Sequence, residues 1–367
     1  MATANCSNVA STPKRVAIIG SGNFASAMSI FIGKNAQSRP EFEDQVNMWV
    51  FEEEVNGQKL TDIINTTHEN VKYLPGIKLP ENIKAVPDLT EACQGANLMI
   101  FCLPHQFIVR TCQTMIGHFN SKDAYALSMI KGFHIKEGPA IQLVSEHITE
   151  HLHVPCASMM GANLANEIAL QKFCETTIGC ENPAMGSLFK RLLETEDFRV
   201  NVTRDFGTVE MCGALKNIVA VGAGFVDGIN GGNNTKACVI RLGLVEMVKF
   251  VRHFFPQANS TTFFESCGVA DLITTCYGGR NRQVAEAFAR AFPNKKLENL
   301  ESEMLNGQKL QGPLTAHEVY DCLIRDQVLD QFPLFATVHR ICISEQSPQD
   351  LIDILKSQPS SYGVLDD

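Results

Sequence analysis

Short apolar runs of strand length recur along the first half of the chain and alternate with segments of helical periodicity. The first run, RVAIIG at 15–20, is β-branched and ends in glycine, and a helical pattern follows it directly. Similar runs lie at 46–51, 96–103, 124–130 and 156–160, with weaker ones at 175–180 and 198–202. A long irregular segment, 68–87, interrupts the series. This alternation predicts a parallel sheet with helices on both faces.

From about residue 203 the strand signal stops, and the rest of the chain reads as helices and loops. Within it, the stretch 209–226 is apolar or small on nearly every side, which is typical of a helix that is buried all round. No apolar run, this one included, reaches the length expected of a membrane-spanning helix. We therefore predict an α/β doubly wound domain at 15–202 and an all-α domain at 203–367, preceded by a disordered tail at 1–14.

Gly20, Gly22 and Ala25 have the GxGxxA spacing and lie between the first predicted strand and helix. The first glycine permits a tight turn, the second lets the backbone approach a pyrophosphate, and the small third residue allows the helix to pack closely on the strand. The helix N-terminus then receives the phosphate charge. A purely structural glycine turn is the alternative, but the position between strand and helix favours a Rossmann-like dinucleotide-binding domain.

Acidic residues follow the second predicted strand, at Glu52, Glu53 and Glu54. An acid at this point normally bonds the adenosine ribose and repels a 2′-phosphate, so Glu52 or Glu53 favours NAD over NADP. The gap from the glycines is longer than the usual ~20 residues. The pattern therefore does not decide which acid acts, and a solvated acidic turn is the alternative.

Lys216 and Asn217 lie in the middle of the apolar stretch. Burying an ammonium costs several kcal/mol unless the group is paired or gives up its proton. The residues one turn to either side on the same face are Cys212, Gly213, Val219 and Ala220. Their small side chains leave room for a ligand beside the amine. The alternative is a lysine that extends its head to water along an apolar helix.

A second polar feature lies further on, where Gly278 and Gly279 precede Arg280 and Asn281 at the start of a predicted helix. A glycine turn, a guanidinium and free helix N–H groups together make a phosphate site. Taken alone, the pattern favours an arginine that simply caps a helix or pairs with an acid. The short polar loop 306–313 carries Lys309 and Gln311, which could reach a ligand or only solvent.

Composition narrows the class of protein. The formal charge of −9 and pI near 5.6 argue against nucleic acid or an acidic membrane surface as the main partner. Thirteen cysteines include no CxxC pair, so no metal site is expected. The N-terminal residues lack the apolar core of a secretory signal. We therefore expect reduced thiols and a cytoplasmic location.

Assembled, these stretches closely resemble the cytosolic NAD-dependent glycerol-3-phosphate dehydrogenases over nearly everything after the N-terminal tail. The matching blocks are GSGN at 20, MWVFEE at 48, HENVKYLPG at 68, PHQF at 104, IKG at 130, GAN at 161, KFCETTIGC at 172, CGALKNIVAVGAGF at 212, NTKACVIRLGL at 234, ESCGVADLITTCYGGRN at 265 and NGQKLQGP at 306. Animal members usually carry Trp-Gly after the asparagine of the fingerprint, whereas this chain has Phe24-Ala25. Phenylalanine keeps an aromatic face and alanine stays small.

The resemblance implies specific site residues and a homodimer. The residues implied to contact NAD are Gly20, Ser21, Gly22, Asn23, Phe24, Ala25, Phe51, Phe107, Ala162, Arg280, Lys309 and Gln311. Those implied to contact the substrate are Lys131, Asn217, Asp271, Thr275, Arg280 and Asn281. Lys216 is implied to transfer the proton, with Lys131 beside it, as dihydroxyacetone phosphate and sn-glycerol 3-phosphate interconvert. This reaction links glycolysis, NADH reoxidation and glycerolipid synthesis.

Two other functions share parts of this pattern. A Rossmann enzyme acting on a β-hydroxy acid or a sugar acid has the same strand–helix plan and a helix-borne lysine, but it needs a carboxylate clamp in place of the Gly-Gly-Arg-Asn turn. A non-catalytic NAD-sensing protein of the same fold binds the cofactor without turnover. The presence of Lys131, Lys216 and Arg280 favours the dehydrogenase.

Overall fold

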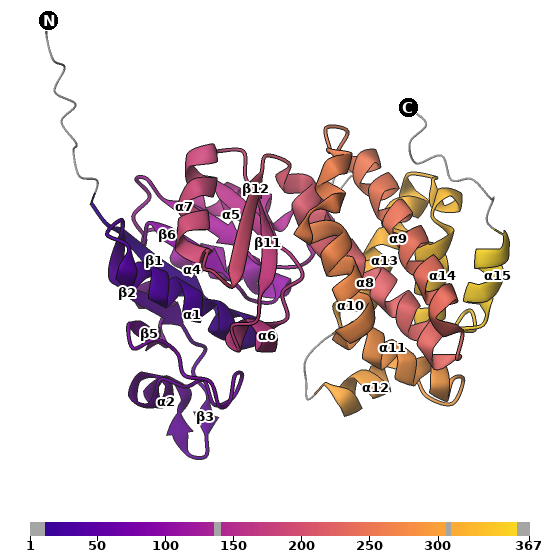
Figure 1. Ribbon diagram of the computed structural model, residues 1–367, viewed down its shortest axis with the longest axis horizontal. Helices are drawn as coiled ribbons and strands as arrows, with labels where there is room; N and C mark the ends of the chain where they lie inside the picture. The colour runs from indigo at the N-terminus through magenta and orange to yellow at the C-terminus, as the bar shows by residue number, and fades with distance from the viewer. Residues whose placement is uncertain (1–11, 136–140, 306–309, 358–367) are drawn as a thin grey trace, which may run out of the picture.

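The computed structural model describes residues 12–135, 141–305 and 310–357. Figure 1 shows two bodies side by side, one built around a sheet and one made of helices. The sheet-forming segments end with β12 (Phe198–Thr203), and the long helix α8 (Phe206–Gly228) begins the helical body. The α/β fold followed by an all-α region is confirmed.

Within the described ranges one sheet has eight strands, in the order β12-β11-β10-β7-β6-β1-β2-β5. The other strands are β1 (Lys14–Ile19), β2 (Phe42–Trp49), β5 (Ile83–Val86), β6 (Leu98–Phe101), β7 (Tyr125–Ser128), β10 (Cys156–Met160) and β11 (Cys174–Gly179). Two hairpins add β3 (Glu54–Val55) with β4 (Gln58–Lys59), and β8 (Phe133–Ile135) with β9 (Ile141–Leu143). From β5 to β10 the sheet is parallel and has the doubly wound order, with its reversal point between β1 and β6.

Two expectations about the sheet were wrong. The segment 68–87 contains the edge strand β5, which pairs with β2. Strand β11 runs antiparallel to β10, because the five-residue helix between them, α6 (Ala165–Ala169), is too short to carry the chain back along the sheet for a parallel crossover. Both features depend on pairing between distant segments and leave little local trace in the sequence.

Alternating side chains of the strands pack into separate cores on the two faces of the sheet. Val16 and Ile18 of β1 face the core under α1 (Asn23–Ser38), α2 (Leu60–Thr67), α6 and α7 (Pro183–Leu193). Ala17 and Ile19 face the core under α3 (Leu89–Ala92), α4 (Ile108–Met115) and α5 (Val144–Leu152). Helices therefore cover both faces of the sheet, as Figure 1 shows.

Helix α8 is the centre of the helical body. The other helices of this body are α9 (Gly232–Phe254), α10 (Asp271–Gly278), α11 (Arg280–Ala291), α12 (Leu297–Met304), α13 (Gln311–Arg325), α14 (Pro333–Cys342) and α15 (Asp350–Ser357). By length and composition α8 could cross a membrane, contrary to the expectation from the sequence, yet its most apolar window is completely buried in the protein. It is therefore the core helix of this body.

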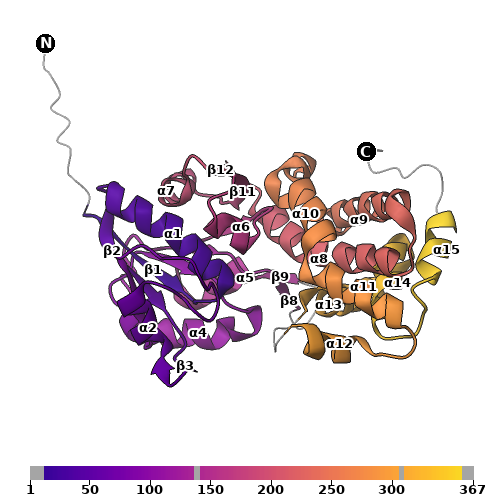
Figure 2. The ribbon, with the colours of Figure 1, turned by 60° about the horizontal axis from the view of Figure 1, so that its bottom comes forward.

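The two bodies share a continuous core at their junction. Met160 at the end of β10 and Phe133 of β8 belong to the same buried cluster as the apolar face of α8. A Cβ added at Gly213 of α8 would lie 2.4 Å from Sδ of Met160, so the helix approaches the sheet very closely here. Figure 2 shows the β8–β9 hairpin between the two bodies. This packing sets the middle of α8 against the carboxyl edge of the parallel strands.

Candidate active site

The loop between β1 and α1 fits a pyrophosphate. Gly20 has φ +123°, and a Cβ there would lie 2.2 Å from the carbonyl oxygen of Cys102, so only glycine fits. At Gly22, the N-cap of α1, a Cβ would meet nothing within 4 Å, which leaves the approach to the helix N-terminus open. No side chain caps α1, and its first turn has no acidic residue. Its N–H groups are therefore available to an anionic group.

A buried asparagine that sequence reasoning did not single out braces this loop. Nδ2 of Asn70 donates hydrogen bonds to the carbonyl oxygen of Ser21 and to Oγ of Ser26, both at 2.8 Å, and the residue is fully buried. Nδ2 of Asn23 donates to the carbonyl oxygen of Tyr73 at 2.7 Å. The only sequence signal was that Asn70 and Tyr73 lie in the block HENVKYLPG. The segment 70–73 thus holds the glycine loop in place.

Both candidate ribose acids have partners within the protein. The carboxylate of Glu52 accepts hydrogen bonds from N (3.3 Å) and Oγ1 (2.6 Å) of Thr61, in the first turn of α2. The carboxylate of Glu53 accepts a hydrogen bond from the Tyr73 hydroxyl at 2.8 Å and forms an ion pair with Lys72. Glu52 thus caps a helix, and the charge of Glu53 is balanced. A ribose contact by either acid stays a prediction.

Three charged groups meet at the junction of the two bodies. Nζ of Lys216 in α8 donates a hydrogen bond to Oδ1 of Asp271, the first residue of α10, and both side chains are at most 5 % exposed. Nζ of Lys131, which follows β7, lies 3.5 Å from Oδ2 of the same aspartate and has a side chain that is 36 % exposed. The structure thus brings the side chains of Lys216, Lys131 and Asp271 together.

The position of Lys216 changes its acidity. Burial lowers the pKa of its amine to about 7, and the nearby charge of Lys131 acts in the same direction, while Asp271 opposes the shift. An amine with this pKa exists in both protonation states near neutral pH. The cluster therefore presents a buried proton-transferring group, held by a carboxylate, next to a second cation that solvent can reach.

The asparagines beside this cluster form a buried chain of hydrogen bonds. Nδ2 of Asn217 donates to the carbonyl oxygen of Gly213 at 3.2 Å, and its Oδ1 accepts from Nδ2 of Asn281 at 3.0 Å. Oδ1 of Asn281 in turn accepts from the backbone N–H of Gly312 at 2.9 Å. This chain fixes the start of α11 and of α13 against the middle of α8. Both amides keep further N–H capacity for a ligand.

Arg280 is the first residue of α11, as the glycine turn predicted. No side chain caps this helix and its first turn has no acid, so its N–H groups suit an anion. The side chain is solvent-accessible, yet desolvation by the surrounding protein lowers the pKa of the guanidinium. Thr275, one turn before the glycine pair, is buried, and its oxygens would clash with any Cβ at Gly279. The turn is thus built for glycine.

The remaining predicted residues lie at the carboxyl edge of the sheet or beside it. Phe51 follows β2 and is 70 % exposed, and Phe107 follows β6 and is 52 % exposed. Ala162 follows β10, and its N–H donates to Oγ of Ser266 at 3.3 Å. Gln311 begins α13, whereas Lys309 lies outside the described residues. Exposed aromatic rings at this edge are suited to stack on a nucleotide base.

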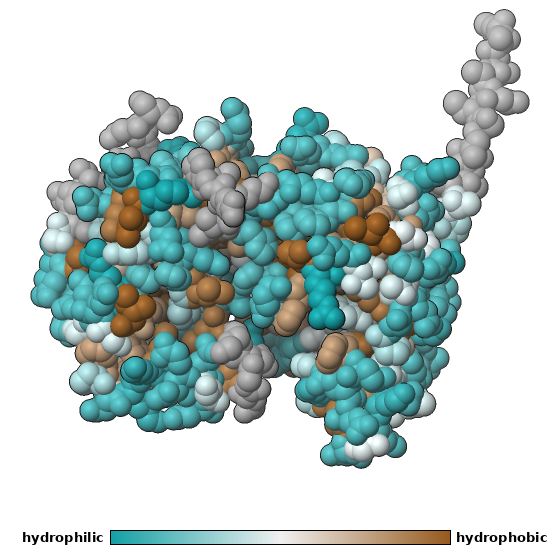
Figure 3. Space-filling model, turned by 180° about the vertical axis from the view of Figure 1, so that it is seen from behind, coloured by the Kyte–Doolittle hydropathy of each residue, from teal (hydrophilic) through white to brown (hydrophobic). Residues whose placement is uncertain are grey.

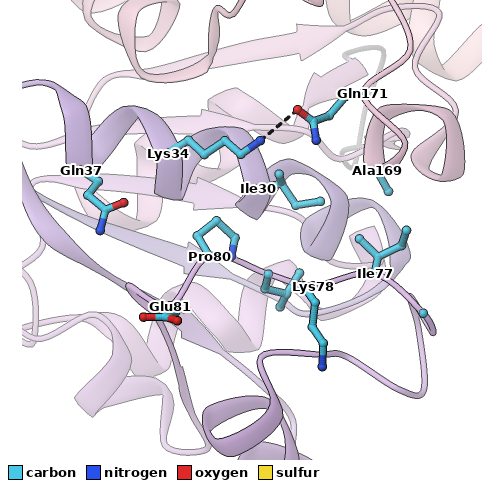
Figure 4. Close-up of a pocket in the computed structure, with 11 residues that line it drawn as sticks. Ile30, Lys34, Gln37, Ile77, Lys78, Pro80, Glu81, Ala169 and Gln171 are labelled. Carbon is cyan, nitrogen blue, oxygen red and sulfur yellow. Dashed lines mark hydrogen bonds between the residues drawn. The ribbon is translucent and has the colours of Figure 1, made fainter.

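One open pocket lies away from these residues. It has a volume of about 490 Å³ and is formed by one side of α1, the loop 76–81, the end of α6 and Gln171. Figure 4 shows the hydrogen bond from Lys34 to Gln171 across it, and none of the described residues lining it is a predicted site residue.

The surface seen in Figure 3 is mostly hydrophilic with small separate apolar patches. The described residues also include no group of three or more His, Cys, Asp or Glu side chains that could hold a metal.

Comparisons with known proteins agree on one family. Residues 15–186 match the model of the NAD-dependent glycerol-3-phosphate dehydrogenase N-terminus, and residues 205–353 match that of its C-terminus. The cytoplasmic NAD⁺ glycerol-3-phosphate dehydrogenase of Drosophila kanekoi is 57 % identical, over 94 % of this chain and 95 % of that protein. The Homo sapiens protein of the same description is 54 % identical, over 94 % of this chain and 98 % of that protein. The structure of glycerol-3-phosphate dehydrogenase from Saccharomyces cerevisiae is 42 % identical, covers 94 % of this chain and 100 % of that one, and has a TM-score of 0.86.

Proposed function

The chain belongs to the NAD-dependent glycerol-3-phosphate dehydrogenases, and we propose that Lys216 transfers the proton in this family's reaction. The enzyme interconverts dihydroxyacetone phosphate and sn-glycerol 3-phosphate with NAD as cofactor. The observation that carries the proposal is the buried cluster at the junction of the two bodies, where Lys216 is held by Asp271 beside Lys131.

The glycine loop and its surroundings fit the cofactor. Gly20 to Ala25 and the N-terminus of α1 would hold the pyrophosphate, since the backbone there is open and uncapped. Phe51, Phe107 and Ala162 would contact the nucleotide at the carboxyl edge of the sheet, and Arg280 and Gln311 would close the site from the helical body. Lys309, outside the described residues, is proposed as a further cofactor contact. The bound cofactor supplies the hydride that reduces the carbonyl carbon.

Lys216 is suited to act in both directions. As an ammonium it donates a proton to the carbonyl oxygen of dihydroxyacetone phosphate, and as a neutral amine it accepts the proton of the C2 hydroxyl of glycerol 3-phosphate. Its pKa of about 7 makes both forms available near neutrality. In this proposal Lys131 binds the substrate, and Lys131 or Asn217 stabilises negative charge on the reacting oxygen. The contacts of Asp271 with both amines support this, because they hold the two lysines beside each other.

The phosphate of the substrate is assigned to the start of α11. Arg280 offers a planar pair of hydrogen-bond donors there, and the Asn281 amide and the N–H groups of the helix are further donors to the phosphate. Asn217 and Thr275 complete the pocket on the α8 and α10 sides. Residues 15–202 would then form the NAD-binding domain and 203–367 the substrate-binding domain.

Two further properties follow from the family resemblance. We propose that the protein is a homodimer, which sedimentation equilibrium of the purified chain tests. We also propose that it acts in the cytoplasm, as the names of its relatives state for them. The cysteines in the described ranges are free thiols, which is compatible with a reducing compartment.

A spectrophotometric assay tests the proposed reaction directly. The purified protein should consume NADH when dihydroxyacetone phosphate is added and form glycerol 3-phosphate in equal amount. A β-keto acid in place of the phosphate ester should give little turnover. Enzymes that act on such acids need a carboxylate clamp at the position where this chain has the Gly-Gly-Arg-Asn turn. Binding of NADH without any turnover would instead support the non-catalytic, NAD-sensing alternative.

A further inference from the structure

A group of charged side chains that the proposed reaction leaves unassigned connects the helices on both sides of the turn 278–281, to which the substrate phosphate is assigned. This turn ends α10 and begins α11. At the centre of the group is Asp227, the last residue but one of α8. Its Oδ2 atom accepts hydrogen bonds from Lys236 of α9 and from Arg282 of α11. One carboxylate oxygen therefore joins three helices.

The bond from Arg282 fixes the beginning of α11. Nη1 of Arg282, two residues after Arg280, donates to Oδ2 of Asp227 at 2.9 Å and to Oε2 of Glu286 at 2.6 Å. The backbones of the two helices also meet here, since a Cβ at Gly224 of α8 would clash with the carbonyl oxygen of Arg282. The first turn of α11 is thus held against α8 by backbone packing and by a side-chain ion pair.

The bond from Lys236 reaches the end of α10. Nζ of Lys236 donates to Oδ2 of Asp227 at 2.7 Å, and the lysine side chain is only 5 % exposed. The same Nζ lies 4.4 Å from the centre of the ring of Tyr277, the residue directly before Gly278. A buried ammonium needs a counter-charge, and it is attracted to the face of an aromatic ring. Asp227 therefore holds Lys236, and Lys236 holds the ring at the end of α10.

The end of α10 matters because this helix connects the two halves of the proposed substrate site. It begins at Asp271, which binds Lys216, and it ends at the turn 278–281. A displacement of its end would change the distance between the amine proposed for the substrate carbonyl and the donors proposed for its phosphate. A misplacement of about 1 Å can cost roughly 10²-fold in rate.

We propose that Asp227 is a positioning residue for the substrate phosphate: through Arg282 and Lys236 it holds the two sides of the turn 278–281 at a fixed separation. The inference rests on the proposed function, because the assignment of the phosphate to this turn belongs to it. Asp227 acts by keeping Arg280 and the N-terminus of α11 where they bind the phosphate while the carbonyl lies in line with the hydride. It does not itself contact the reacting atoms.

Tyr277 offers the mildest test, because it is 55 % exposed and its substitution leaves the buried charges paired. Tyr277→Leu removes the ring face that Lys236 contacts, and Tyr277→Phe keeps it. We expect the KM for dihydroxyacetone phosphate to rise roughly three- to tenfold in the leucine variant. The phenylalanine variant should stay within about twofold of wild type, since only the ring is needed.

Asp227→Asn keeps the shape of the side chain and removes the charge that Lys236 and Arg282 share. The kcat/KM for dihydroxyacetone phosphate should fall roughly 10- to 100-fold, whereas that for dihydroxyacetone, which lacks the phosphate, should stay within about threefold. The ratio of the two values is the readout, because a general loss of folded enzyme lowers both alike. Asp353→Asn, at an exposed aspartate of α15 that pairs with Lys356, is the matched control and should leave both values unchanged.

Removal of the buried cation shows whether Asp227 acts through Lys236. In the Lys236→Met background, Asp227→Asn should lower the ratio by a smaller factor than in the wild type, since only the bond to Arg282 is left to lose. This background also protects the test from misfolding, because it removes the cation that Asp227→Asn leaves without a counter-charge. If Asp227→Asn alone does not fold, the double variant is compared with Lys236→Met, and its ratio should still be the lower of the two.

Four results would overturn the proposal. These are equal losses toward dihydroxyacetone phosphate and dihydroxyacetone in Asp227→Asn, an undiminished effect of Asp227→Asn in the Lys236→Met background, a double variant with the ratio of Lys236→Met, and a Tyr277→Leu variant that matches Tyr277→Phe. The proposed function fails in a different way. A wild type that binds NADH but leaves dihydroxyacetone phosphate unreduced would refute it, whatever Asp227 does.

Discussion

At the scale of single residues, the proposed chemistry depends on one amine whose surroundings decide its protonation. Lys216 is buried in an apolar helix, and its single acidic partner, Asp271, is shared with Lys131. Lys216→Met keeps most of the side-chain volume and removes the proton. We expect kcat to fall by ~10²–10⁴, the range typical for loss of a positioned acid or base. NADH binding should stay near normal, and a variant with near-wild-type kcat would remove Lys216 from the mechanism.

The pH dependence of the two directions should be opposite. Reduction of dihydroxyacetone phosphate needs the ammonium form of Lys216, so its rate should fall as the pH rises through about 7, where the buried amine loses its proton. Oxidation of glycerol 3-phosphate needs the neutral amine and should rise over the same interval. Initial rates in both directions across this pH range check the assignment. Two profiles that move in the same direction would point to a different titrating group.

Arg280 carries the assignment of the substrate phosphate. Each charge-assisted hydrogen bond contributes roughly 1.5–3 kcal/mol, so Arg280→Ala should lower kcat/KM for dihydroxyacetone phosphate by ~10²–10⁴. Because binding energy at a remote phosphate also helps to hold the carbonyl in line, kcat should fall as KM rises. Dihydroxyacetone, which lacks the phosphate, should be a poor substrate for both wild type and variant. If the variant loses activity toward both compounds by the same factor, the arginine serves only the cofactor or the fold, and the phosphate assignment is wrong.

At the scale of elements, the connection from β2 to α2 separates the two candidate acids. Glu53 balances Lys72, so Glu53→Gln should free that lysine to bind a 2′-phosphate and should relax the preference for NADH over NADPH. Glu52 caps α2 through Thr61, so Glu52→Gln should mainly lower the melting temperature. The ratio of kcat/KM for the two cofactors decides between them. A larger change of this ratio in the Glu52 variant would reverse the assignment.

The elements that could be predicted from the sequence are those with a local signal. Strand β1, the glycine turn, the buried helix α8 and the start of α11 each follow from periodicity or from turn residues within a few positions. Strand β5 and the reversed direction of β11 could not be predicted, since they depend on which distant strand each one pairs with. Helix α8 (Phe206–Gly228) extends beyond the predicted stretch 209–226 at both ends.

In the candidate site, too, residues with a local sequence signal could be predicted, and residues that act through distant contacts could not. Lysines in apolar stretches and glycines before a guanidinium are visible in the sequence, and Lys216, Lys131 and Asp271 do come together. Asn70 was missed because its importance lies in contacts across a long sequence separation, to Ser21 and Ser26 of the glycine loop. The ion pair of Glu53 with Lys72 likewise depends on how a loop folds back on a strand.

At the scale of the whole molecule, the net charge and the charge of the site have opposite signs. The chain carries a formal charge of −9, whereas the substrate and the cofactor are anions and the accessible groups Lys131 and Arg280 are cations. Two opposing effects of salt therefore compete. Screening of the overall charge would help the anions to approach, and screening of the two local cations would weaken their binding.

The local cations should dominate, because the Debye length is about 10 Å at 0.1 M salt and charges spread over the far surface are already screened at that distance. We therefore expect kcat/KM for dihydroxyacetone phosphate to fall several-fold as NaCl rises from about 0.1 M to about 1 M, where the Debye length shrinks from about 10 Å to about 3 Å. Arg280→Lys keeps the charge and should retain the slope, whereas Arg280→Gln should flatten it. A kcat/KM that rises with salt in the wild type would mean that the overall negative charge controls access, and that the site cations act only in direct contact with the bound phosphate.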